Sequence, residues 1–214
     1  MPFRDRREAG RELARCLRVL QEKGAFPDPV VVLALPRGGV AVAAEVARAL
    51  DAPLDVLVVR KIGAPSHEEY GIGAIVGDGP PLFDDWALDQ LGLSEADLAP
   101  VVARERRELH RRERLYRQGR PAPELGGRTV IVVDDGLATG VTASAALSSV
   151  RRQEPARVVL AVPVSSPEAA ELLSHDADDV ICLKRPSSFT AVGLCYEDFE
   201  QLTDDDVLRA LHGD

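Results

Sequence analysis

The stretch Val130–Thr142, which reads VIVVDDGLATGVT, constrains the fold more than any other part of the chain. Its leading β-branched residues show no polar alternation, and this pattern predicts a strand buried on both faces, as in a parallel sheet. Asp134 and Asp135 follow at the carboxyl end of that strand, the edge where open α/β sheets bind ligands. The stretch therefore predicts a buried strand, a ligand-binding turn and a helix over Thr139–Val150.

The turn after the two acids has the features of a phosphate-binding loop. A helix N-terminus presents unpaired N–H groups and partial positive charge. Gly136 and Gly140 let the backbone approach an anion closely, and the hydroxyls of Thr139 and Thr142 add donors. Carboxylates only accept hydrogen bonds, so the acid pair suits a ribose diol. The turn predicts a ribose-phosphate site, and an acid pair that merely caps the helix is the simpler alternative.

A second unit of the same kind lies nearer the N-terminus. Val30–Leu35 is an apolar run that predicts another buried strand, Pro36–Gly39 is a tight turn, and Val40–Leu50 is an alanine-rich helix. The carboxyl ends of parallel strands meet at one edge of a sheet. We therefore expect this turn, with its exposed amides and Arg37, to bind a second phosphate group beside the first.

Further apolar runs extend this pattern over most of the chain. Leu54–Val59 predicts a third buried strand, and the basic pair Arg60 and Lys61 at its end should face the same sheet edge, unless it is an ordinary solvated pair. Arg157–Val164 and Asp179–Leu183 predict two more core strands. The sequence therefore predicts a single α/β domain over residues 1–214, built on a doubly wound, mainly parallel sheet with helices on both faces.

The composition narrows the classes of function. With 214 residues the chain can bury one domain and an elaboration. Its net charge is −9, and this acidic balance argues against nucleic acid as the main partner. The sequence has no apolar run of membrane length and no signal peptide, and its three cysteines lack metal-site spacing. We therefore expect a cytoplasmic protein that does not bind a membrane.

These motifs together resemble the type I phosphoribosyltransferases, which bind phosphoribosyl pyrophosphate (PRPP). The signature of that family is four apolar residues, two acids and a Gly/Thr-rich phosphate loop, and every position of Val130–Thr142 fits it. The sequence PRGG resembles the pyrophosphate loop of the same family. That loop often contains a non-proline cis peptide bond, which the resemblance would place between Pro36 and Arg37.

The resemblance implies a set of substrate contacts and a Mg²⁺ cofactor. Asp134 and Asp135 would hold the ribose hydroxyls, favour a cationic transition state and reach the metal mainly through substrate or water. Arg37, Arg60 and Lys61 would stabilise the departing pyrophosphate, and Lys61 is expected to be catalytic together with the two acids. The implied substrate contacts are Pro36, Arg37, Gly38, Gly39, Arg60, Lys61, Asp134, Asp135, Gly136, Ala138, Thr139, Gly140, Val141 and Thr142.

Residues 62–128 are expected to form an insertion, because this part of the chain is longer than in minimal members of the family. A flexible glycine-rich loop over Ile62–Gly79 would close over the site, with a surface hairpin as the alternative. Asp84–Leu91 and Glu95–Gln118 predict a short helix and a long one. The many arginines of the long helix fit a salt-bridged, solvated helix better than a nucleic-acid site. The insertion would be a cap over the site or a subunit contact in a homo-oligomer.

The segment Lys184–Leu202 lies where the family has a hood over the nucleobase, and it loosely resembles the hood of the 6-oxopurine enzymes. Phe189 and Tyr196 would then stack on a base, and Asp198 would accept a hydrogen bond from a ring N–H. Burial of these aromatic residues in the core is an equally good interpretation.

The predicted function is transfer of ribose 5-phosphate from PRPP to a nitrogen acceptor, with a nucleobase as the expected acceptor and pyrophosphate as the leaving group. Such an enzyme would serve purine or pyrimidine salvage. The main alternative is a regulatory or sensor protein that binds PRPP without transferring the sugar. A PRPP synthase-like enzyme is disfavoured by the length of the chain, and a hydrolase of a phosphoribosyl compound is a further alternative. The sequence leaves the acceptor base open.

Overall fold

The computed structural model describes residues 1–27, 29–65 and 67–213. In these residues the core is a five-stranded parallel sheet in the order β2-β1-β6-β7-β8. Its strands are β1 (Val30–Ala34), β2 (Leu54–Val56), β6 (Thr129–Val133), β7 (Arg157–Val164) and β8 (Asp179–Lys184). The predicted α/β class and parallel core are confirmed.

Helices cover both faces of this sheet because successive strand residues point to opposite sides. Val32 and Ala34 of β1 belong to a buried apolar cluster that includes residues of α1, α2 and α7. Val31 and Leu33 belong to a second cluster that includes residues of α5 and α6. The helices are α1 (Arg6–Glu22), α2 (Gly38–Leu50), α5 (Val141–Arg151), α6 (Pro167–Leu173) and α7 (Asp204–His212).

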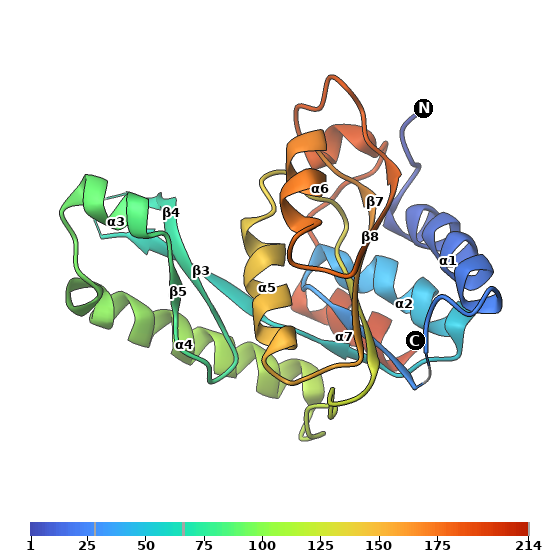
Figure 1. Ribbon diagram of the computed structural model, residues 1–214, viewed down its shortest axis with the longest axis horizontal. Helices are drawn as coiled ribbons and strands as arrows, with labels where there is room; N and C mark the ends of the chain where they lie inside the picture. The colour runs from blue at the N-terminus through green and yellow to red at the C-terminus, as the bar shows by residue number, and fades with distance from the viewer. Residues whose placement is uncertain (28, 66, 214) are drawn as a thin grey trace.

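A second, smaller sheet and two helices project from the core, on the left of Figure 1. We call this part, Val59–Arg117, the wing. Its antiparallel strands and its helices are β3 (Val59–Ala64), β4 (His67–Val76), β5 (Leu82–Phe83), α3 (Asp85–Leu91) and α4 (Glu95–Arg117). The two predicted helices are present, and the segment predicted as a closing loop forms the β3–β4 hairpin. Closure of this hairpin over the site stays a prediction.

The prediction of one strand over Leu54–Val59 was wrong at its carboxyl end. Only Leu54–Val56 pairs with β1, and the chain then passes into the antiparallel sheet at Val59. Leu57 and Val58 between the two strands are both buried, one in each apolar cluster. The apolar run therefore continues from β2 into β3. Hydrophobicity alone does not show where the chain stops pairing with β1 and starts pairing with β4.

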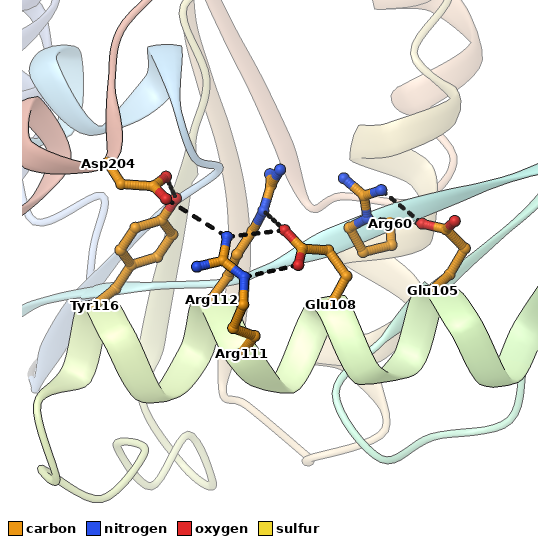
Figure 2. A network of polar contacts seen from close by, with 7 residues as sticks. All are labelled: Arg60, Glu105, Glu108, Arg111, Arg112, Tyr116 and Asp204. Carbon is orange, nitrogen blue, oxygen red and sulfur yellow. Dashed lines mark hydrogen bonds and ion pairs between the residues drawn. The ribbon is translucent and has the colours of Figure 1, made fainter.

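The long helix α4 is anchored to its surroundings by ion pairs and hydrogen bonds, as Figure 2 shows. Its Glu105 accepts from Arg60 of β3, with Nη2 2.6 Å from Oε2. Its Tyr116 hydroxyl donates to Asp204 of α7 at 2.5 Å. Ion pairs along the helix hold the pKa of Glu108 at about 2, mainly through Arg111. The prediction of a salt-bridged helix fits these contacts.

The C-terminal tail crosses the start of the chain before α7. Phe3 N–H donates to the carbonyl of Cys195, and Glu197 N–H donates to the carbonyl of Phe3. A short 3₁₀ helix, Val192–Cys195, precedes this crossing. Among the helices in the described ranges, none combines the length and the apolar character needed to cross a membrane.

Candidate functional site

Two turns lie in direct contact at the carboxyl edge of the parallel sheet, one after β1 and one after β6. Leu35 N–H donates to the carbonyl of Val133 at 2.9 Å. A Cβ on Gly38 would overlap the carboxylate of Asp135, and a Cβ on Gly39 would lie 2.7 Å from the carbonyl oxygen of Val133. The peptide bond between residues 36 and 37 is cis, at the position that the family resemblance implied. The structure thus brings PRGG against the acid pair.

The helices that follow these two turns, α2 and α5, begin without a side-chain cap. Every other α-helix in the described part of the chain begins with an Asp, Ser or Thr that caps it or forms a capping box. The first N–H groups of a helix have no partner within the helix, and the helix dipole favours an anion there. The starts of α2 and α5 are therefore two places at the same sheet edge where an anion could supply the missing cap.

The turn after β6 is anchored on its inner side and exposed on its outer side. Leu137 N–H donates to the carbonyl of Val164 at 3.0 Å, and Ser166 Oγ donates to the carbonyl of Ala138 at 2.8 Å. Gly140 precedes α5 with a φ of 78°, a conformation that favours glycine. Ala138, Thr139 and Val141 are exposed. A ligand can therefore reach the loop without displacing the contacts that shape it.

The acid pair is partly buried, with 14% of the Asp135 side chain exposed, and this burial affects its ionisation. Burial raises the pKa of Asp134 well above the usual range of a carboxyl, and the charge of Asp135 raises it further. Burial also raises the pKa of Asp135, while its hydrogen bond to Arg6 opposes that rise. Asp135 N–H donates to Asp134 Oδ1 at 2.8 Å. The two carboxyl groups are therefore unequal: burial and the charge of its neighbour both raise the pKa of Asp134, whereas Arg6 limits the rise for Asp135.

Arg6 is the site residue that sequence reasoning missed. Its Nε lies 2.7 Å from Asp135 Oδ2, and only 10% of its side chain is exposed. Arg6 follows the N-cap Asp5 in the first turn of α1, between charged neighbours on both sides. One arginine in such a run carries no local signal of burial, because 129 residues separate it from its partner.

The three basic residues predicted to contact pyrophosphate have different surroundings. Arg60 is engaged by Glu105 of α4, and Lys61 is exposed on β3. Burial and the hydrogen bond to Asp204 raise the pKa of the Tyr116 hydroxyl of α4, and the charge of Arg37 slightly opposes this rise. Arg37 is thus the predicted basic contact that lies on the turn against the acid pair.

The three residues of the predicted base site do not line one common cavity. Tyr196 is 5% exposed, its ring stacks on Phe199 with centroids 4.9 Å apart, and its hydroxyl donates to the carbonyl of Asp135 at 2.5 Å. The prediction that Tyr196 stacks on a base does not fit this arrangement, because its ring is already covered. Phe189 and Asp198 line two different cavities, of about 330 Å³ and 660 Å³.

The residues at the sheet edge fit a metal that arrives with its substrate. Within the described residues, no group of three or more His, Cys, Asp or Glu side chains could hold a metal ion by itself. The acid pair offers two carboxylates, one of them bound to Arg6. Mg²⁺ commonly keeps several waters and takes one or two carboxylates together with substrate phosphates. Asp134 and Asp135 are the residues that would approach such an ion.

Asp134→Asn should raise the free energy of unfolding at neutral pH by about 0.5–2 kcal/mol. When folding raises the pKa of a carboxyl, its ionised form is less favourable in the folded chain than in the unfolded chain. The free energy of unfolding therefore falls as the pH rises through the pKa. The pKa of Asp134 is raised, so its ionisation lowers stability near pH 7. Denaturant unfolding at about pH 7 and about pH 4 measures the effect, which should shrink at the lower pH.

The exposed Asp89 supplies the matched control, because Asp89→Asn should leave stability unchanged at both pH values. Equal stability of Asp134→Asn and the native chain at neutral pH would contradict the raised pKa of Asp134.

Comparison with known proteins agrees with this geometry. The sequence family described as "Phosphoribosyl transferase domain" matches residues 5–199. The chain is 45% identical over 209 residues to "Putative phosphoribosyl transferase Rv0571c" of Mycobacterium tuberculosis, and the match covers 98% of this chain and 46% of that protein. The chain thus spans about half the length of the curated relatives it matches. It is also 47% identical to TT1426 from Thermus thermophilus, whose crystal structure it matches with a TM-score of 0.82 over 99% of this chain and 98% of that one.

Proposed function

Because the chain belongs to the phosphoribosyl transferase domain family, we propose that it transfers the ribose 5-phosphate of PRPP to a nitrogen acceptor, expected to be a nucleobase, and releases pyrophosphate. The contact between Pro36–Gly39 and the pair Asp134–Asp135 carries this proposal. It gathers two uncapped helix starts and two carboxylates at one sheet edge. PRPP has a phosphate group at each end of its ribose and a diol between them, and these groups match that arrangement.

The residues of the site take complementary roles in this reaction. Asp134 and Asp135 accept hydrogen bonds from the ribose diol, and their charge favours the positive charge that develops at the anomeric carbon. Residues 136–142 bind the 5′-phosphate through N–H groups and threonine hydroxyls. Arg37 and the amides of the first turn bind pyrophosphate as its bond to the anomeric carbon breaks. The acceptor nitrogen forms the new bond to the anomeric carbon, and its proton passes to water or to the released pyrophosphate. Because no residue of the chain bonds covalently to the sugar, positioning and electrostatics account for most of the catalysis.

We propose that Arg60 and Lys61 make no contact with pyrophosphate while the wing keeps this conformation. Arg60 would have to leave Glu105 before it could meet pyrophosphate, and Lys61 lies exposed on the wing. Mg²⁺ bound with PRPP would neutralise charge on the leaving group.

A panel of purine and pyrimidine bases tests the proposed function. Each base is incubated with PRPP and Mg²⁺, and release of pyrophosphate is measured. We expect release with at least one base and none without a base. Tight PRPP binding with no release for any base would contradict transfer and favour the sensor alternative. A chain that fails to bind PRPP would contradict the whole assignment.

Removal of Mg²⁺ should lower the rate of transfer on the order of 100-fold or more, because charge on the departing pyrophosphate is then less well neutralised. The rate is measured in excess chelator and again after Mg²⁺ is restored, and we expect full recovery. Binding of PRPP in chelator, followed by calorimetry, serves as the control for an intact site. An unchanged rate in chelator would remove Mg²⁺ from the proposal.

A further inference from the structure

We propose that Arg6 is a positioning residue that orients Asp135 toward the ribose diol and joins the acid pair to the C-terminal tail. This inference rests on the proposed function, since it assigns a role in binding the ribose of PRPP. Arg6 comes from the first turn of α1 and Asp135 from the turn after β6, so their contact depends on the tertiary structure.

Arg6 makes contacts in three directions. Its Nε donates to Asp135 Oδ2 at 2.7 Å, and its Nη1 donates to the carbonyl of Glu200 at 2.8 Å. Its guanidinium carbon lies 3.8 Å from the ring centroid of Phe199, a cation–π distance. One planar group therefore links α1, the acid pair and the tail.

These contacts favour positioning over direct binding of a phosphate by Arg6. The side chain is 90% buried, and rotating it toward an anion would break the ion pair with Asp135, the bond to Glu200 and the stacking on Phe199. Loss of a partner in a buried ion pair leaves an uncompensated charge, which is strongly unfavourable. We therefore expect Arg6 to keep its place when PRPP binds.

The tail holds the main chain of Asp135 as well as its side chain. The hydroxyl of Tyr196 donates to the carbonyl of Asp135, and the ring of Tyr196 stacks on Phe199. Phe199 thus supports both the arginine that binds the carboxylate and the tyrosine that binds the carbonyl. A residue held at both points loses the freedom to turn its carboxylate away from the site.

The ion pair also decides which carboxylate oxygen can meet the ligand. Oδ2 of Asp135 is bound to Arg6, and a Cβ on Gly38 would overlap this same oxygen. Because Oδ2 already accepts from Arg6 and lies against Gly38, we expect Oδ1 to be the oxygen that accepts from a ribose hydroxyl. Without Arg6 the carboxylate could rotate, and the contact to the diol would weaken while the phosphate contacts of the two turns would not.

The test compares ligands that share phosphates but differ in the diol. Affinities of PRPP, ribose 5-phosphate and inorganic pyrophosphate are measured by calorimetry for the native chain and for Arg6→Gln, Arg6→Lys and the control Arg18→Gln. Arg18 lies on the same helix and is well exposed, with 62% of its side chain accessible. Circular dichroism and thermal unfolding establish that each variant is folded. With a base that supports turnover, kcat and KM are measured separately.

We expect Arg6→Gln to lower the affinity for PRPP and for ribose 5-phosphate on the order of 100-fold. The affinity for pyrophosphate should fall by less than about threefold. Arg6→Lys should recover part of the loss, because it keeps the charge but not the geometry of the guanidinium. The KM for PRPP should rise and kcat should fall in Arg6→Gln, because the misplaced carboxylate serves both binding and the transition state. Arg18→Gln should behave as the native chain.

Native affinity of Arg6→Gln for PRPP would overturn the proposal, and so would equal losses for PRPP and pyrophosphate, which indicate general damage. If Arg6→Gln does not fold, Arg6→Lys decides alone: unchanged affinity for the diol ligands overturns the proposal, and a selective loss supports it. Failure of the native chain to bind PRPP would instead contradict the proposed function, so the two failures are distinguishable.

Discussion

Replacing both Asp134 and Asp135 with asparagine should abolish turnover while the chain stays folded. In the proposed reaction the two carboxylates accept hydrogen bonds from the ribose diol, and their negative charge favours a cationic transition state. Removing one such electrostatic group commonly costs about 10²–10³-fold in rate, and removing both should cost at least that much. The measurement is release of pyrophosphate from PRPP with an active base, together with circular dichroism to show that the fold is retained.

The variant should stay folded because the two changes act on stability in opposite directions. Asp134→Asn removes a buried carboxyl whose pKa is raised, and this favours the folded chain. Asp135→Asn leaves Arg6 without its charged partner, although the amide oxygen can still accept its hydrogen bond. The exposed pair Asp89 and Asp205, changed to asparagine together, controls for the loss of two charges. Near-native turnover of the double site variant would refute the assignment of these acids.

Gly38→Ala should reduce PRPP affinity and turnover on the order of 100-fold. The added Cβ would overlap the carboxylate of Asp135 and would lie 2.5 Å from its Cγ. Either the carboxylate or the PRGG turn must then move, and both are proposed to contact the substrate. Calorimetry with PRPP and with pyrophosphate shows which contact is lost. We expect both affinities to fall, in contrast to the selective effect predicted for Arg6→Gln.

Gly126→Ala is the matched control for Gly38→Ala, since a Cβ on Gly126 would approach nothing closer than 3.6 Å, at the carbonyl oxygen of Gln153. It should bind PRPP like the native chain. Unchanged PRPP affinity in Gly38→Ala would show that this turn can move without affecting the site. It would contradict the claim that PRPP binding requires the close contact between the two turns.

Local patterns were enough to predict the two strand–turn–helix units. Val130–Val133 and Val30–Ala34 are apolar at every position because both faces of a central parallel strand are buried. The glycines and acids that follow them are short-range signals, and they mark the sheet edge without knowledge of the rest of the chain. Their pairing as neighbouring strands follows from the same logic and is observed between β1 and β6.

Other site residues depended on contacts that no local pattern encodes. Arg60 lies beside a predicted strand end but pairs with Glu105, which is 45 residues away on the wing. Tyr196 has the character expected of a residue that stacks on a base, yet the start of the chain and Phe199 cover its ring. The sequence gives the chemical type of these side chains, but their partners depend on how the wing and the C-terminal tail pack in the folded chain.

The sequence by itself determined the parallel core, the two strand–turn–helix units and the place of the acid pair, because each is encoded by a few adjacent residues whose physical requirements are local. Only the tertiary structure decided that Arg6 binds Asp135, that Arg60 is engaged on the wing and that Tyr196 supports the acid from behind. Burial of a charged or aromatic side chain depends on what packs over it, and here the covering residues come from distant parts of the chain.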